Sequence, residues 1–315
     1  MLEKTLFMSS SIETLPILIS LQEKAKEVAL FTVGDSREGR GQKRAISKLK
    51  QEAIKKNIQV FQGNSFAAES TVRLIKSFRP EIILTADFSL FLPEEILKIP
   101  LHGCLNIHPS LLPKYRGPSP IIEAILKGES FTGITIFLMS QIIDGGKILF
   151  QKKLPIEPQD TAQGLKKKLF KEISKDLIKV ILNWKNKKTK PSLQKEKEAN
   201  YTKKYLKKDG EIDWNMTAQN IERRIRAFCP WPGTWTSWEG KKVKILKARP
   251  LVLEKTGKEG CVFLIKNSKK PKIGVFCGTN ALEIQELQLE GKKALLAEDF
   301  MRGRPDFLGA VLGKQ

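Results

Sequence analysis

The sequence predicts an α/β protein of two domains: a Rossmann-like domain with a mainly parallel sheet, then a small C-terminal β-barrel of oligonucleotide-binding type. Three observations lead to this fold class. The first half alternates short apolar runs with amphipathic segments, as in parallel strands joined by right-handed crossovers. The segment 185–204 has almost no apolar residues, which indicates a basic linker. Beyond it, five short strand-like runs separated by turns suggest a small open barrel. We therefore expect domains at residues 1–184 and 205–315.

The expected elements follow from the spacing of apolar residues. In the first domain, strands are predicted at Thr5–Ser10, Val28–Val33, Ile58–Phe61, Glu81–Ala86, Leu101–His108, Thr132–Met139 and Lys147–Lys153. Its helices are predicted at Glu13–Ala25, Ile46–Asn57, Phe66–Phe78, Ile121–Lys127 and Leu165–Trp184. In the second domain, helices are predicted at Thr217–Phe228 and Ala297–Met301, and strands at Thr234–Trp238, Lys242–Lys247, Cys261–Lys266, Ile273–Cys277 and Leu282–Leu289.

A polar, glycine-punctuated stretch, Gly34–Arg44, follows the second predicted strand. It has no apolar periodicity, so we expect an exposed, mobile loop. Four of its residues make it a basic finger: Arg37, Arg40, Lys43 and Arg44. Taken alone, the stretch is equally typical of an ordinary solvated loop.

Composition argues against several function classes. The 315 residues, 41% of them hydrophobic, suffice for ordinary cores, and no run is long enough to span a membrane. The N-terminus also lacks a secretory signal pattern, so we expect a cytoplasmic protein. The four cysteines have neither paired spacing nor nearby histidines, and we expect no disulfide framework and no metal site. Ser9-Ser10-Ser11 stands where a dinucleotide-binding fold would have its glycine-rich turn, which disfavours a nicotinamide or flavin cofactor.

The chain is strongly basic, with a formal net charge of +22. A general bias of the organism toward lysine can supply part of this charge. Between Gln163 and Asn200, however, 12 Lys stand against 4 Asp plus Glu. Such clustering favours a polyanion such as RNA, through phosphate contacts and counterion release. The lysine-rich face of the helix predicted at Leu165–Trp184 is either solvated or in contact with RNA.

The stretch Cys104–Pro120 reads C-L-N-I-H-P-S-L-L-P-K-Y-R-G-P-S-P and holds one of the chain's two histidines. Leu101–His108 is short and mostly apolar, so alternation puts Asn106 and His108 on one face of a strand. An amide donor beside an imidazole can hold a developing oxyanion, and the imidazole can move a proton. Pro109 ends the strand, and the loop after it lies at the sheet edge where ligands of open α/β folds bind. A histidine hydrogen-bonded into the core is the plainer alternative.

The run N-I-H-P-S-L-L-P-K-Y-R-G, followed downstream by Asp144 in I-I-D-G-G, resembles the folate-dependent formyltransferases. The resemblance implies that Asn106, His108 and Asp144 act together on the formyl carbon of 10-formyltetrahydrofolate. Asn106 would donate a hydrogen bond to the oxyanion, His108 would add a second donor when protonated, and Asp144 would orient His108. No covalent nucleophile is implied, so Cys104 is expected to serve in packing.

The same resemblance implies a folate pocket around the central loop. The residues expected there are Phe88, at an aromatic position that lines the pterin pocket in the family, and Ser110, Leu111, Leu112 and Pro113, which would bracket the folate. Ser89 replaces the glycine that usually follows the aromatic residue, and Ser140 and Gly145 are further departures from the family pattern. Arg116 is either a ligand contact or a clamp for its loop.

The acceptor implied is the free amino group of methionyl-initiator tRNA, which would make the activity part of translation initiation. In methionyl-tRNA formyltransferases a G-R-G loop reaches the acceptor end of the tRNA, and Gly39-Arg40-Gly41 resembles it. The basic linker and the predicted barrel agree with an RNA substrate. Three alternatives stay open: a sugar-nucleotide formyltransferase, which would have no need of a basic finger, a formyl-folate hydrolase, and a catalytically silent RNA-binding protein. No obligate protein partner is evident.

Overall fold

The computed structural model describes residues 2–38, 43–253, 257–265 and 271–313. The chain divides into two compact units, each with its own sheet. The first unit comprises Met1–Pro120, Phe131–Pro155 and Leu165–Thr202, and the second comprises Ile121–Ser130, Ile156–Gly164 and Lys203–Gln315. Two short segments of the N-terminal half thus group with the second unit. The expected domain limits, 1–184 and 205–315, stay a prediction.

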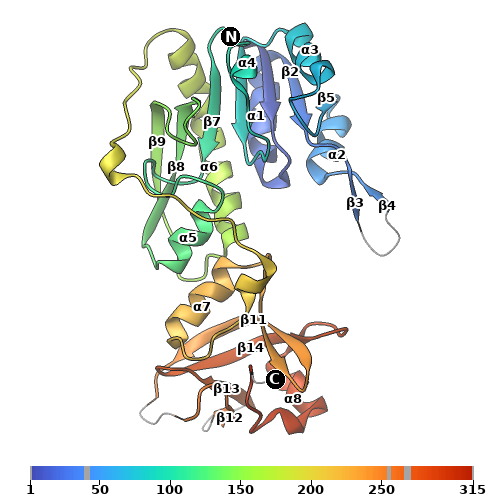
Figure 1. Ribbon diagram of the computed structural model, residues 1–315, viewed down its shortest axis with the longest axis vertical. Helices are drawn as coiled ribbons and strands as arrows, with labels where there is room; N and C mark the ends of the chain where they lie inside the picture. Colours follow the sequence, from blue (N-terminus) through green and yellow to red (C-terminus); the bar gives the residue numbers. More distant parts are fainter. Residues whose placement is uncertain (1, 39–42, 254–256, 266–270, 314–315) are drawn as a thin grey trace. The chain divides into compact units, whose positions relative to one another are not determined.

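The first unit contains a seven-stranded sheet in the order β5-β2-β1-β6-β7-β8-β9 (Figure 1). Its strands are β1 (Leu2–Met8), β2 (Ala25–Thr32), β5 (Gln59–Gln62), β6 (Ile82–Ala86), β7 (Cys104–His108), β8 (Phe131–Leu138) and β9 (Ile148–Pro155). Neighbouring strands are parallel from β5 through β7, and β8 and β9 join antiparallel. The prediction of a mainly parallel, Rossmann-like sheet is confirmed.

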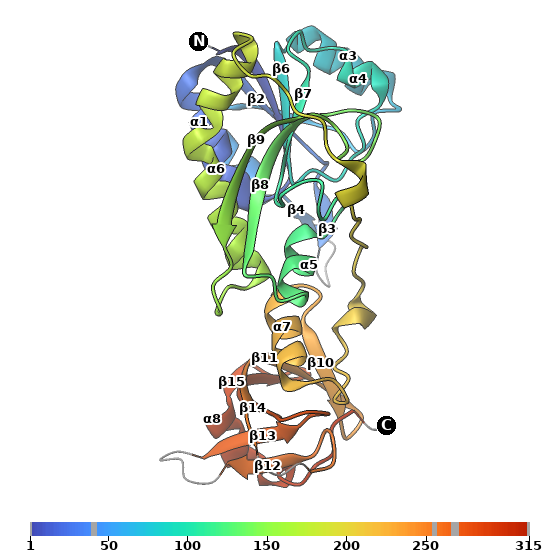
Figure 2. The same cartoon turned by 90° about the vertical axis from the view of Figure 1, so that its left-hand side faces the viewer.

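Helices cover both faces of this sheet. They are α1 (Leu15–Lys24), α2 (Lys48–Lys55), α3 (Glu69–Phe78), α4 (Glu94–Leu97) and α6 (Ala162–Lys185), whereas α5 (Pro120–Leu126) groups mostly with the second unit. Figure 2 shows α1 and α6 on one side of the sheet and α3 and α4 on the other. On the α3 side, the core joins Ile75 and Phe78 to Leu6, Ile83 and Cys104. Because side chains alternate along β7, the residues two and four places after Cys104 face the same side.

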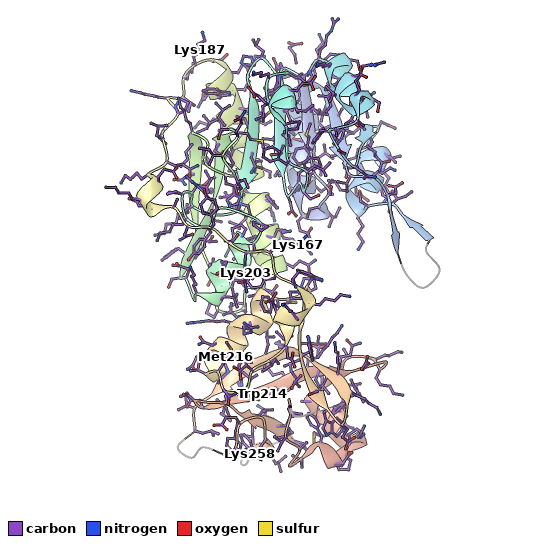
Figure 3. All side chains as sticks on the ribbon, viewed as in Figure 1. Lys167, Lys187, Lys203, Trp214, Met216 and Lys258 are labelled. Carbon is purple, nitrogen blue, oxygen red and sulfur yellow. The ribbon has the colours of Figure 1, made fainter. Side chains whose placement is uncertain are left out.

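Helix α6 is amphipathic, as its periodicity predicts. Its buried residues are Leu165, Leu169, Phe170, Ile173, Leu177, Val180 and Ile181. Lysines occupy the opposite face, where Lys167 and Lys171 are exposed; Figure 3 labels Lys167 near the start of the helix and Lys187 just beyond its end. The exposure of this face agrees with either solvation or RNA contact, so the RNA contact stays a prediction.

The basic finger contains regular structure that the sequence pattern did not predict. β3 (Ser36–Glu38) pairs antiparallel with β4 (Lys43–Ala45), with Arg37 opposite Arg44 and Glu38 opposite Lys43. Figure 1 shows these strands apart from the seven-stranded sheet. The expectation of an irregular loop was therefore wrong for its two ends. Each of these strands is three residues long, which is too short to show an alternation of apolar and polar residues.

The second unit contains an antiparallel sheet in the order β10-β11-β14-β13-β12, with β15 paired to β14. Its elements are α7 (Ala218–Ala227), β10 (Thr234–Trp238), β11 (Lys241–Leu251), β12 (Val262–Ile265), β13 (Lys272–Phe276), β14 (Ala281–Leu289), β15 (Leu295–Leu296) and α8 (Ala297–Gly303). Trp214, labelled with Met216 in Figure 3, belongs to the core and donates from Nε1 to Thr236 Oγ1 at 3.0 Å. In the described part of the chain no ladder joins β10 to β12, so closure into a barrel stays a prediction.

Candidate active site

Strand β7 presents Asn106 with its amide orientation fixed. Asn106 lies opposite Thr85 of β6, and its Oδ1 accepts a hydrogen bond from Thr85 Oγ1 at 2.7 Å. Since the amide oxygen is occupied, the amide nitrogen points the other way. Nδ2 makes no hydrogen bond to any residue that the structure describes. The strand therefore holds an N–H donor that is oriented and free for a ligand.

His108, two residues further on, is 5% exposed and has a defined neighbour at each ring nitrogen. Its Nε2 lies 2.9 Å from the carbonyl oxygen of Tyr115. A carbonyl oxygen only accepts hydrogen bonds, so Nε2 carries a hydrogen. Nδ1 faces Asp144 Oδ2 at 3.6 Å. The same Asp144 oxygen accepts the backbone N–H of Gly117 at 2.7 Å. The imidazole is thus held between a backbone acceptor and a carboxylate.

Asp144 lies in the loop between β8 and β9, and this loop is tightly placed. Asp144 adopts φ +49°, in the left-handed region, a conformation that costs a non-glycine residue about 1–3 kcal/mol. Two residues later, a Cβ at Gly146 would lie 1.8 Å from the Leu138 carbonyl oxygen, so only glycine allows the loop to pass this close to β8. The Nε2 of Gln194 donates to the carbonyl oxygens of both Asp144 and Gly146, each at 2.7 Å. The polar segment after α6 therefore holds the backbone of the loop.

Arg116 is fully buried, with 0% exposure, and its guanidinium makes five hydrogen bonds. Nε and Nη2 donate to Gln194 Oε1 at 3.1 and 2.9 Å. Nη1 and Nη2 form a bidentate pair with Glu196 at 2.9 and 2.7 Å, and Nη1 also reaches Tyr201 Oη at 3.0 Å. Hydrogen bonding to Glu196 raises the pKa of Arg116. With no donor left for a ligand, Arg116 is a clamp for its loop.

The central loop is anchored by polar contacts to β8 and β9. Ser110 Oγ donates to the Lys114 carbonyl at 2.7 Å, and Thr135 Oγ1 donates to the Ser110 carbonyl at 2.6 Å. The side chains of Ser110 and Leu112 are buried, at 0% and 3% exposure, whereas those of Leu111 and Pro113 are half-buried. The buried pair supports the loop, and the other two lie at its surface. Contact of these four residues with folate stays a prediction.

Phe88 follows β6 and packs in an aromatic group. Its ring centroid lies 6.0 Å from that of Phe31 and 6.3 Å from that of Phe66. The Phe88 side chain is half-buried, and Ser89 beside it is exposed. A role for Phe88 in binding the pterin stays a prediction. Near Asp144, Ile142 and Ile143 are 57% and 58% exposed, an unusual exposure for two adjacent isoleucines.

The structure does not bring every predicted site residue to one place. It joins His108 to Asp144 directly, with Asn106 two residues away on the same strand. The finger residues belong to another element: Arg37, Lys43 and Arg44 lie on β3 and β4, and Arg40 lies outside the described residues.

Cys104 lies beneath the site and has no nucleophilic character. It is 2% exposed, and its Sγ contacts the Ile96 carbonyl oxygen at 3.7 Å. Burial raises the pKa of this thiol to about 12, so it carries no thiolate at neutral pH. This agrees with the expected packing role.

The described residues contain neither a cluster of metal ligands nor a membrane-spanning helix. No three His, Cys, Asp or Glu side chains come together as a metal site would require. No helix there has the length and apolar content needed to cross a bilayer.

Sequence reasoning missed the residues that orient this site. They are Thr85, Tyr115, Gly117, Gln194, Glu196, Asn200 and Tyr201. Gly117, at φ +99° and in the recognised Y-R-G run, could have been found from its motif. Tyr115 belongs to the same run, and Thr85 lies on a predicted strand. The other four lie in a polar segment without apolar periodicity, and no sequence pattern marks them.

Comparison with known proteins identifies the family. Residues 9–181 match the model of formyl transferases, and residues 204–305 match that of the formyl transferase C-terminal domain. The chain is 38% identical over 311 residues to a protein of Caldanaerobacter subterraneus named methionyl-tRNA formyltransferase, with 98% of this chain and 99% of that one covered. A protein of Pseudoalteromonas translucida with the same name is 37% identical over 296 residues, covering 93% and 92% of the two chains.

Solved structures share the fold at lower identity. HypX from Aquifex aeolicus, in complex with tetrahydrofolic acid, superposes with a TM-score of 0.67 at 20% identity, over 96% of this chain and 47% of that one. A methionyl-tRNA formyltransferase from Clostridium thermocellum gives a TM-score of 0.58 at 19% identity, over 88% and 100% of the two chains. With both sequence domains matched and relatives aligned over nearly the whole length, this chain belongs to the formyl transferase family.

Proposed function

We propose that this protein transfers the formyl group of 10-formyltetrahydrofolate to the free amino group of methionyl-initiator tRNA, and so supports translation initiation. The nearly full-length relatives at 37–38% identity carry the name of this activity. Within the site, one observation carries the chemistry: an oriented, unpaired amide donor at Asn106 lies beside buried His108 and half-buried Asp144.

The residues present fit a formyl donor with a flat ring system. Asn106 Nδ2 supplies the donor that the formyl oxygen needs, and it has no competing partner in the described part of the chain. Exposed Ile142 and Ile143, next to Asp144, provide apolar surface for a ring. Leu111 and Pro113 offer further half-buried apolar surface on the central loop.

The reaction forms a bond between the acceptor nitrogen and the formyl carbon, and breaks the bond from that carbon to N10 of the folate. Asn106 stabilises the negative charge that develops on the formyl oxygen. A protonated His108 adds a second donor through Nδ1, which at 3.6 Å is too far from Asp144 Oδ2 to be hydrogen-bonded to it. Asp144 holds His108 in position and accepts the proton that leaves the acceptor amine, directly or through water. The proton finally passes to N10, so that atoms and charge balance. No covalent link to the protein forms.

The remaining regions fit an RNA acceptor. Arg37, Arg40, Lys43 and Arg44 concentrate positive charge on the finger, and their loss would weaken binding to phosphates. We further propose that the antiparallel sheet of the second unit forms an oligonucleotide-binding barrel, and that the protein works in the cytoplasm, where charged tRNA is used. No obligate protein partner is needed for this reaction.

The test is a formyl-transfer assay with 10-formyltetrahydrofolate and charged initiator tRNA. The unmutated protein is compared with His108→Ala, Arg40→Ala and the matched control His102→Ala, which removes the chain's other histidine. We expect His108→Ala to lower kcat about a hundredfold or more, Arg40→Ala to raise KM for tRNA, and His102→Ala to leave both unchanged.

Other outcomes would overturn the proposal in distinct ways. Formate release without transfer would indicate a formyl-folate hydrolase. Salt-sensitive tRNA binding without either reaction would indicate a silent RNA-binding protein. Transfer to amino-sugar nucleotides in place of tRNA would indicate a sugar-nucleotide enzyme, since two solved sugar formyltransferases share the fold at 20% and 22% identity.

A further inference from the structure

We infer that the segment Ser192–Thr202 positions the catalytic His108–Asp144 pair, with Gln194 as the principal positioning residue. The inference deepens the proposed formyl transfer and rests on it. Ser192–Thr202, called the strap below, belongs to the first unit and follows helix α6. Its sequence, S-L-Q-K-E-K-E-A-N-Y-T, contains little that could build a core. Its polar groups nevertheless contact both of the segments that flank the imidazole.

On the Nδ1 side, the strap fixes the loop that carries the carboxylate. Gln194 Nε2 donates to the carbonyl oxygens of Asp144 and Gly146 at 2.7 Å each. Asp144 has the unfavourable φ of +49°, so its peptide needs outside contacts to keep this orientation. Ser192 also exchanges backbone hydrogen bonds with Ile148 at 2.8 and 2.9 Å. The strap therefore determines where the Asp144 carboxylate points.

On the Nε2 side, the strap fixes the carbonyl that binds the imidazole. Tyr115 N–H donates to Asn200 Oδ1 at 2.6 Å, and Arg116 N–H donates to the Asn200 carbonyl at 2.9 Å. Thr202 N–H donates to the Arg116 carbonyl at 2.7 Å. These bonds hold the turn whose Tyr115 carbonyl accepts from His108 Nε2. Both neighbours of the imidazole are thus placed by one segment.

Arg116 joins the two sides. Its guanidinium donates to Gln194 Oε1 and so fixes which end of the Gln194 amide is nitrogen. The nitrogen must then face the Asp144 and Gly146 carbonyls. Arg116 itself is 0% exposed and cannot reach substrate. We assign positioning roles to Gln194 and Arg116, because neither contacts the reacting atoms. A displacement of a catalytic group by about 1 Å can slow a reaction by about a hundredfold.

The sharpest variant is Gln194→Glu. A glutamate has the same shape and still accepts from Arg116, but its second oxygen would face two carbonyl oxygens that need a donor. We expect kcat for formyl transfer to fall about 10- to 100-fold, with KM for tRNA and for folate unchanged within about twofold. Gln141→Glu is the matched control: it makes the same change in the β8–β9 loop, at a side chain that bonds to exposed Glu94.

A double-mutant cycle separates positioning from general damage. In an Asp144→Asn background the carboxylate is already gone, so Gln194→Glu should cost less than about twofold further. If Gln194→Glu lowers kcat in that background as much as it does in the unmutated protein, the inference is overturned, because the effect does not then depend on the Asp144 carboxylate. Normal kcat in Gln194→Glu, or a change confined to KM, would overturn it as well.

The NMR resonances of the two histidine rings test this inference separately from the proposed function. In a protein labelled with ¹⁵N-histidine, Gln194→Glu should shift the His108 ring resonances and leave those of His102 in place. If the unmutated protein transfers no formyl group, the proposed function fails, and the spectrum still decides whether the strap positions His108. Unchanged His108 resonances would contradict the inference whatever the activity.

Discussion

Strand β7 and the strap contribute to the same site in opposite ways. β7 is short and mostly buried, its apolar residues alternate with polar ones, and it carries Asn106 and His108. The strap has no strand, only one 3-10 turn at Glu196–Glu198, and few apolar residues. In the proposed mechanism the strand supplies reactive groups, and the strap supplies hydrogen bonds that hold the two neighbours of the imidazole in place. The comparison teaches that Asn106 and His108 lie two residues apart in the sequence, whereas their orientation depends on polar contacts from residues far along the chain.

The largest expected effect comes from the strand. Asn106→Ala removes the free donor while His108, Asp144 and the strap stay in place. We expect kcat to fall about 100- to 1000-fold, as for loss of one oxyanion donor, with little change in KM. Single-turnover formyl transfer measures it, with Asn186→Ala, an exposed asparagine just beyond α6, as control. A loss within about threefold would show that the amide is not the donor.

Removing the clamp should affect stability as well as rate. Arg116→Met deletes five hydrogen bonds from a buried position and leaves Gln194 Oε1 without its partners. Because Glu196 is largely exposed, water replaces its lost hydrogen bonds and limits the destabilisation. We expect the free energy of unfolding to fall by about 2–4 kcal/mol. Urea denaturation measures it. The control is Arg73→Met, whose ion pair with Glu69 is exposed and should contribute less than about 0.5 kcal/mol. Equal losses in the two variants would contradict the clamp.

Acid should weaken the ion pair between the strap and Arg116. The hydrogen bond from Arg116 lowers the pKa of Glu196 below its ordinary value of 4.5. A carboxyl group whose pKa is lowered by folding stabilises the protein above its unfolded pKa, and this contribution is lost as the pH falls through the folded value. Between about pH 5 and pH 3 the unmutated protein should therefore lose more stability than Glu196→Gln. Urea midpoints across this range test it, and parallel curves for the two proteins would refute it.

Much of the first unit could be predicted from the sequence, because buried strands and amphipathic helices impose period-2 and period-3.6 apolar patterns. The finger hairpin and β15 were not predicted, because Ser36–Glu38 and Leu295–Leu296 are too short to show an apolar pattern. Asn106, His108 and Asp144 stood out through their motif and the scarcity of histidine. Gln194 did not, because a glutamine in a polar segment looks the same whether it is solvated or bonded to a catalytic loop.

The most direct test of the account is single-turnover formyl transfer to methionyl-initiator tRNA by Asp144→Asn. Asparagine keeps the shape and can still accept the Gly117 N–H, but it removes the charge that faces His108 Nδ1 at 3.6 Å. We predict that the rate falls by at least about 100-fold, while the affinity for tRNA and the urea midpoint stay unchanged. A rate within about twofold of the unmutated protein would contradict the claim that the His108–Asp144 pair carries the reaction.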